Sequence, residues 1–64
     1  MKNRVKEMRK ERGLTQDELA KALKVSRQTI NAIENNKYNP TLELAMKLAK
    51  YIRLPVEELF ILDE

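Results

Sequence analysis

Apolar residues recur at helical spacing along almost the whole chain, and this periodicity restricts the possible folds more than any other feature of the sequence. Helix-breaking residues are few, because Gly13 is the only glycine and Pro40 and Pro55 are the only prolines. The pattern predicts an all-α fold of short helices with no sheet. A chain of 64 residues is long enough for a single domain, over residues 1–64. A domain of this size buries only about 60% of the surface of its unfolded chain.

The first two helices are delimited by Gly13 and Thr15. The first is predicted over about residues 3–12 and ends at Gly13. The second begins at Thr15, because a hydroxyl followed three residues later by the carboxylate of Glu18 forms a capping box. The residues expected to face inward on these two helices are Val5, Met8, Leu19, Ala20 and Leu23.

A third helix is predicted from its cap Ser26 to about Asn35, with Ile30 and Ile33 facing inward. A loop follows, and either Asn39 or Thr41 caps the fourth helix. That helix is apolar around so much of its circumference that we expect it to be central and buried. Its apolar residues are Leu42, Leu44, Ala45, Leu48, Ala49, Tyr51 and Ile52.

The fifth helix is short, over about residues 55–60, and Pro55 suits its first turn.

The positive charge lies in the first part of the chain. Residues 1–37 hold ten Lys or Arg against five Asp or Glu, whereas residues 38–64 hold three against five. The first part is therefore suited to a polyanionic partner. An ordinary solvated helical surface explains the same charges, and the charges alone favour that explanation.

Residues 15–35 have the organisation of a helix-turn-helix unit, in which the second of two short helices enters a DNA groove. The face of that second helix opposite Ile30 carries amides and an alanine, with Arg27 at its edge. Arginine pairs with guanine, asparagine and glutamine pair with adenine, and an alanine methyl packs on thymine. The alternative is a solvated helix that is rich in asparagine. The candidate base-reading residues are Arg27, Gln28, Asn31 and Ala32.

Residues at the start of the second helix and at the end of the third are placed to contact DNA phosphates. Gln16 lies beside the free backbone amides of a helix start, which attract anions. For Gln16 a plain surface side chain is the simpler interpretation. Phosphate contacts fix the register of a protein on DNA, whereas base contacts fix its specificity. The candidate phosphate-contacting residues are Thr15, Gln16, Asn35, Asn36 and Lys37.

The sequence resembles the Cro/CI–XRE family of helix-turn-helix repressors. The likeness is carried by RGLTQDELA at residues 12–20, VSRQTI at 25–30 and IENNK at 33–37, and it continues to EELF at 57–60. It implies a compact five-helix, lambda-repressor-like DNA-binding domain. It also implies a sequence-specific transcriptional regulator, a repressor, that docks its third helix in the major groove of double-stranded DNA. Such a protein binds a two-fold symmetric operator as a homodimer.

By position, the resemblance assigns base reading to Arg27 and Gln28 and places Ala32 facing the groove. Asn31 matches a more variable position. Phosphate contacts are assigned to Gln16, Asn35 and Lys37.

The resemblance also pairs Arg9 with Glu34, tying the first helix to the third; two unrelated surface charges are the alternative. Lys24, Asn36 and Arg53 depart from the family pattern, because they stand where the family usually has glycine. If Lys24 and Arg53 adopt the left-handed backbone conformation, each costs about 1 kcal/mol.

The end of the chain, about residues 55–64, is a candidate dimerisation segment. Five of the nine residues from Val56 to Glu64 are apolar, although chain ends are usually polar and frayed. Packing of Val56 and Leu59 onto the first and fourth helices is the alternative for part of this segment. The candidate dimer-interface residues are Phe60, Ile61 and Leu62.

Several classes of protein are excluded by composition. The chain has no Cys, no His and no glycine-rich loop, so we expect no enzyme, no metal, no cofactor and no small-molecule ligand. No apolar run reaches the roughly 20 residues of a membrane span, and no signal peptide is present, which predicts a cytoplasmic, nucleoid-associated protein of a prokaryote. The alternative function is a protein-interaction module of the same fold, such as an antitoxin or a coactivator bridge.

Overall fold

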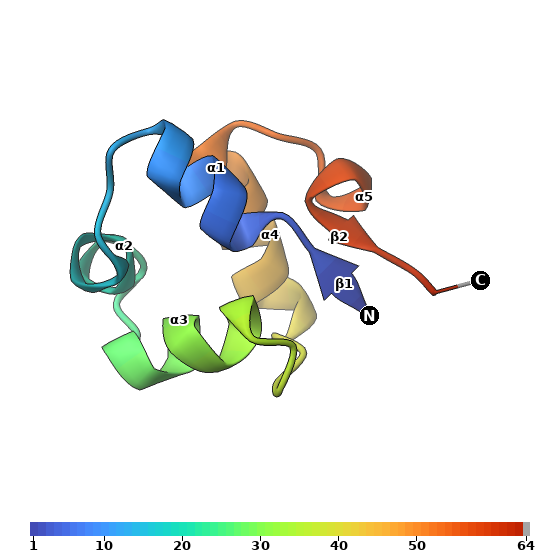
Figure 1. The fold of residues 1–64 in the computed structure, drawn as a ribbon, viewed down its shortest axis with the longest axis horizontal. Coiled ribbons are helices and arrows are strands. Elements are labelled where there is room, and N and C mark those ends of the chain that lie inside the picture. Colours follow the sequence, from blue (N-terminus) through green and yellow to red (C-terminus); the bar gives the residue numbers. More distant parts are fainter. Residues whose placement is uncertain (64) are drawn as a thin grey trace.

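Helices form most of residues 1–63, the part of the chain that the computed structural model describes. Within these residues they are α1 (Val5–Glu11), α2 (Gln16–Leu23), α3 (Arg27–Glu34), α4 (Leu42–Ile52) and α5 (Val56–Leu59). The predicted five-helix fold is confirmed, and its maximum extents are 32 × 21 × 19 Å. In Figure 1, α3 runs along one edge of the molecule, with α2 beside its first turn and α1 on the opposite side.

The expectation of no sheet was wrong, because the two ends of the chain pair. Strand β1 (Lys2–Asn3) is antiparallel to β2 (Phe60–Ile61), with Lys2 opposite Ile61 and Asn3 opposite Phe60. Figure 1 shows this pair beside α5, away from α2. Residues that are far apart in sequence form it, so the local periodicity of apolar residues carried no sign of it. Asn3 therefore belongs to β1 and not to the first helix.

Side-chain caps start three of the helices where the sequence places them. Thr15 Oγ1 accepts a hydrogen bond of 3.0 Å from the Glu18 amide, and Glu18 Oε1 accepts one of 2.8 Å from the Thr15 amide. Ser26 caps α3. Thr41, rather than Asn39, caps α4. The capping box predicted from the sequence is thus complete.

Three non-glycine residues adopt left-handed backbone conformations at the ends of helices. The φ angles are +59° at Lys24, +59° at Asn36 and +67° at Arg53, beside +68° at Gly13. These three are the positions at which the resemblance led us to expect glycine, and the backbone is left-handed there despite the side chains. Asparagine tolerates this conformation better than lysine or arginine does.

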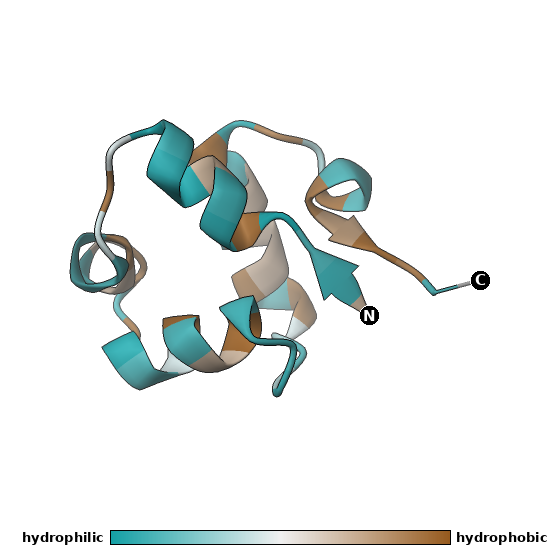
Figure 2. Ribbon diagram, in the orientation of Figure 1, coloured by the Kyte–Doolittle hydropathy of each residue, from teal (hydrophilic) through white to brown (hydrophobic). Residues whose placement is uncertain are grey.

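The core lies between α1, α2, α3, α4 and α5, and Figure 2 shows apolar colour on the inward sides of the helices and on β2. All five inward residues predicted for α1 and α2 are buried, as are Ile30 and Ile33. The large side chains with essentially no exposure are Val5, Leu19, Ile30, Ile33, Leu48, Ile52 and Leu59.

Helix α4 is less buried than its sequence suggests. Leu42 is 73% exposed and Tyr51 is 45% exposed, although both lie on stripes expected to face inward. Met46, on the same helix, is 56% exposed. Only the side of α4 that carries Leu48 and Ile52 is fully covered. A domain of this size has too few neighbouring elements to surround a helix completely.

Candidate nucleic-acid interface

The exposed face of α3 presents the side chains predicted to read bases. Arg27, Gln28 and Asn31 are exposed, and Ala32 is half-buried. A hollow of about 440 Å³ is lined by Gln16, Arg27, Gln28 and Asn31. The fold thus brings Gln16, from the first turn of α2, onto the same surface as three of the predicted base-reading residues.

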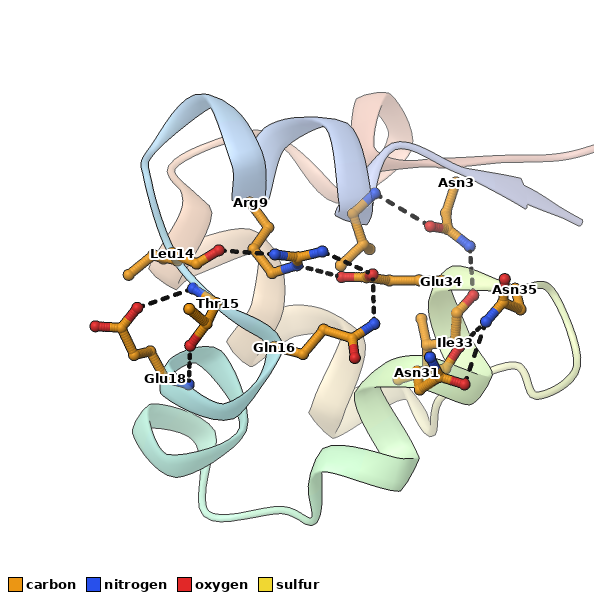
Figure 3. A network of polar contacts seen from close by, with 11 residues as sticks. Asn3, Arg9, Leu14, Thr15, Gln16, Glu18, Asn31, Ile33, Glu34 and Asn35 are labelled. Atoms are coloured by element: carbon orange, nitrogen blue, oxygen red, sulfur yellow. Dashed lines mark hydrogen bonds and ion pairs between the residues drawn. The ribbon is translucent and has the colours of Figure 1, made fainter.

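Glu34 joins three helices through its carboxylate, as Figure 3 shows. Arg9 of α1 donates from Nε to Glu34 Oε2 at 2.7 Å and from Nη2 to Oε1 at 3.2 Å. Gln16 Nε2 of α2 donates to the same Oε1 at 3.0 Å. Arg9 Nη1 also donates to the Leu14 carbonyl at 2.7 Å. Arg9 and Glu34 thus form a two-pronged, charge-assisted contact, the strongest class of side-chain hydrogen bond.

The bond to Glu34 limits how many hydrogen bonds the Gln16 side chain can donate to DNA. A glutamine amide nitrogen carries two hydrogens, and the contact with Glu34 uses one of them. The other hydrogen is available for a phosphate. The sequence placed Gln16 near phosphate but did not reveal that Glu34 holds its side chain, because the two residues lie on different helices.

Thr15 and Asn35 are more constrained than the sequence indicates. The Thr15 hydroxyl accepts the capping bond from Glu18, and its own hydrogen can still be donated. Asn35 Nδ2 donates to the Asn31 carbonyl at 2.9 Å and to Asn31 Oδ1 at 3.2 Å. A phosphate contact from Asn35 therefore requires it to exchange these bonds. Asn36 and Lys37 are exposed beyond the end of α3.

Asn3 contacts the end of the predicted recognition helix, a contact that sequence reasoning missed. Its Nδ2 donates to the Ile33 carbonyl at 2.9 Å and to Asn36 Oδ1 at 3.0 Å, and its Oδ1 accepts from the Val5 amide at 3.1 Å. Figure 3 shows the side chain directed from β1 toward the end of α3. The signal in the sequence was an asparagine just before the first helix, and a local capping role explains only the bond to Val5.

The three residues predicted to form a dimer contact have different surroundings. Phe60 is 7% exposed and belongs to the core of its own chain, because its pairing in β2 turns the ring inward. Ile61 is 42% exposed and Leu62 is 69% exposed. The structure thus leaves Ile61 and Leu62, and not Phe60, available to a second protomer.

No group of three His, Cys, Asp or Glu side chains within residues 1–63 is arranged to hold a metal ion. Across the same residues, no helix combines the length and the apolar character needed to cross a membrane.

Two short helices joined by residues 24–26, with a capped second helix that exposes amides and a guanidinium, define a helix-turn-helix protein. Comparison with known families leads to the same class of protein. The family model described as helix-turn-helix matches residues 5–59, and the chain belongs to this family, of the Cro/CI–XRE type. The members are DNA-binding transcriptional regulators and not enzymes, as the sequence predicts.

Similar proteins occur in archaea and bacteria. An uncharacterised HTH-type transcriptional regulator of Methanocaldococcus jannaschii is 52% identical over 64 residues, which cover 100% of this chain and 97% of that protein. An uncharacterised HTH-type transcriptional regulator of Bacillus subtilis is 44% identical, with 100% and 97% coverage. A transcriptional repressor of a cryptic phage in Vibrio cholerae is 37% identical over 57 residues, covering 89% of this chain and 51% of the repressor.

Proposed function

We propose that the protein is a transcriptional repressor that binds double-stranded DNA sequence-specifically as a homodimer, with α3 as the recognition helix in the major groove. The observation that carries this proposal is the hollow on the exposed face of α3, lined by Gln16, Arg27, Gln28 and Asn31. Similarity to a phage repressor supports repression, as opposed to activation, of transcription. The chain acts in the cytoplasm of a prokaryotic cell, on nucleoid DNA.

The side chains on this face are matched to base edges. Arg27 and Gln28 lie in the first turn of α3, the part of a recognition helix that reaches deepest into the groove. Arginine pairs in two-pronged fashion with guanine, and glutamine with adenine. Asn31 and Ala32 follow one turn later, where an amide and a methyl group discriminate adenine and thymine.

Phosphate contacts would flank the base-reading face at both ends. Gln16, with one amide hydrogen held by Glu34, offers the other to the backbone of one strand. Thr15 shares the start of α2. At the other end of α3, the exposed Asn35, Asn36 and Lys37 would contact phosphates on the far side of the groove. These contacts set the register in which Arg27 and Gln28 meet the bases.

Homodimerisation is proposed through the end of the chain. Ile61 and Leu62 are exposed apolar neighbours that directly follow the buried Phe60. A contact around a two-fold axis at these residues would bury them and would add to the small core of a 64-residue chain. It would also set two copies of α3 about 34 Å apart, the spacing of successive major grooves on one face of DNA.

Selection of binding sites from a random pool of duplex DNA tests the proposal directly. We expect enrichment of a two-fold symmetric sequence whose half-sites lie about 10 base pairs apart, centre to centre. When that sequence overlaps a promoter in a transcription assay with purified components, adding the protein should reduce the amount of transcript. Failure to enrich any sequence would overturn sequence-specific binding, and increased transcript would overturn repression.

The dependence of affinity on salt separates this function from a protein-interaction module. Neutralising about six phosphates per dimer predicts a slope near −5 in a plot of log affinity against log salt concentration. A flat response would favour the protein partner instead. The exposed Leu42 and Met46 on α4 would then be the first surface to test, by substituting each with serine.

A further inference from the structure

Asn3 connects three parts of the molecule that are separate in sequence. It lies in β1, opposite Phe60 of β2, so it belongs to the paired chain ends. Its amide nitrogen bonds to the Ile33 carbonyl and to Asn36 Oδ1, both at the end of α3. Its amide oxygen accepts from the Val5 amide at the start of α1. One side chain therefore joins the paired chain ends to the start of α1 and to the end of α3.

Asn3 reinforces the end of α3. The Ile33 carbonyl, in the last turn of the helix, accepts from the Asn36 amide at 3.1 Å and also from the Asn3 side chain at 2.9 Å. The chain then turns at Asn36, whose φ angle is +59°. The bond from Asn3 to Asn36 Oδ1 stabilises this turn. Glu34 fixes α3 to α1 and α2 on one side, and Asn3 fixes it to the paired chain ends on the other.

We infer that Asn3 is a positioning residue for base recognition: its amide holds the C-terminal half of α3 in register with the chain ends. This inference rests on the proposed DNA-binding function. Asn36 supplies the side-chain acceptor for this contact, and a glycine at this position would lack it. Through β1 and β2, Asn3 also links α3 to Ile61, one residue of the proposed dimer contact.

Asn3→Asp is the informative substitution. An aspartate has nearly the same shape and still accepts from the Val5 amide, but it cannot donate to Ile33 or to Asn36. We expect about a tenfold decrease in the ratio of affinity for the selected site to affinity for random duplex. The loss of discrimination should be larger at base pairs read by Asn31 and Ala32 than at those read by Arg27. Asn39→Asp places the same added charge on an exposed loop residue and should leave the ratio unchanged.

Asn36→Gly is the second variant, and it guards against failure of the first to fold. Glycine keeps the left-handed backbone and removes the bond from Asn3 together with the proposed phosphate contact of Asn36. The loss of discrimination in Asn36→Gly should be smaller than that in Asn3→Asp. When Asn36→Gly is added to Asn3→Asp, the further loss should be smaller still, because the bond between the two residues is already absent. Loss of a phosphate contact alone would instead weaken binding to all sequences equally.

A second readout follows the helix itself. Amide hydrogen exchange of the Asn36 and Lys37 amides, which bond to the Ile33 and Ala32 carbonyls, should accelerate in Asn3→Asp more than exchange in α2 does. The inference is overturned if folded Asn3→Asp protein keeps the discrimination of the wild type, or if exchange accelerates uniformly. Absence of specific binding by the wild type would be a failure of the proposed function instead.

Discussion

Arg9 in α1 and Glu34 in α3 form a nearly dry ion pair, with 2.7 Å between Nε and Oε2 and side chains only 9% and 1% exposed. Because Glu34 also accepts from Gln16, this contact holds the recognition helix against both preceding helices. A charge left unpaired in such a place is costly, whereas removal of both charges is much less so.

We therefore predict that Arg9→Met or Glu34→Gln alone lowers the free energy of unfolding by about 3 kcal/mol. The combined variant should lose clearly less than the sum, with a coupling above about 1 kcal/mol in urea denaturation. The exposed pair of Asp17 and Lys21 is the matched control and should couple by less than about 1 kcal/mol. Additive effects of Arg9 and Glu34 would contradict the prediction.

Removal of the base-reading groups should change specificity as well as affinity. Arg27→Ala and Gln28→Ala should each cost about 1–3 kcal/mol on the selected site and relax discrimination at one or two base pairs. Fluorescence anisotropy with site variants measures both effects. Lys37→Ala is the control, since loss of a phosphate contact should weaken all sequences alike and reduce the salt slope by about 1. Equal losses for Arg27→Ala on specific and random DNA would make it an electrostatic contact only.

Backbone strain at the helix ends predicts two stabilising substitutions. Lys24→Gly and Arg53→Gly should each raise the free energy of unfolding by up to about 1 kcal/mol, because glycine adopts positive φ without steric cost. Gly13→Ala should do the reverse. No neighbouring atom lies within 4 Å of the added carbon at Gly13, so its cost would come from the backbone alone. Chemical denaturation of the three variants checks this, and destabilisation by Lys24→Gly would show that the lysine makes a compensating contact.

The dimer proposal is tested by Ile61→Lys. We expect sedimentation to show a monomer, with operator affinity falling far more than affinity for random DNA, because the second recognition helix is lost. Leu42→Lys removes an equally apolar, more exposed residue of α4 and should leave the dimer intact. If Ile61→Lys protein still sediments as a dimer, or if the wild type is a monomer at micromolar concentration, the contact at the chain end is refuted.

Acid should weaken one exposed contact of α1 in a defined way. The hydrogen bond and charge of Arg4 lower the pKa of Glu7 below its ordinary value of 4.5, and Glu7 raises the pKa of Arg4. The stabilisation is therefore complete above pH 4.5 and is lost as the pH falls through the lowered pKa of Glu7. NMR titration of the Glu7 carboxyl should show the lowered pKa, which Arg4→Ala should return to its ordinary range. An unchanged pKa in that variant would exclude Arg4 as its cause.

Local features of the sequence were sufficient to predict the helices and most of their limits. Thr15 with Glu18, Ser26 and Gly13 act within a few residues of themselves, so their effects can be read without a fold. The buried faces of α1, α2 and α3 followed from periodicity for the same reason. The pair of Arg9 and Glu34, 25 residues apart, came from family resemblance and not from local chemistry.

Tertiary structure decided the rest, because those contacts join residues that the chain brings together only on folding. Three contacts span separate elements: the pairing of β1 with β2, the bonds of Asn3 to the end of α3, and the hydrogen bond from Gln16 to Glu34. The same holds for burial: Phe60 is covered while Leu42 and Tyr51 are not. Periodicity identifies an apolar side of a helix, but the number of neighbouring elements determines how much of that side is removed from water.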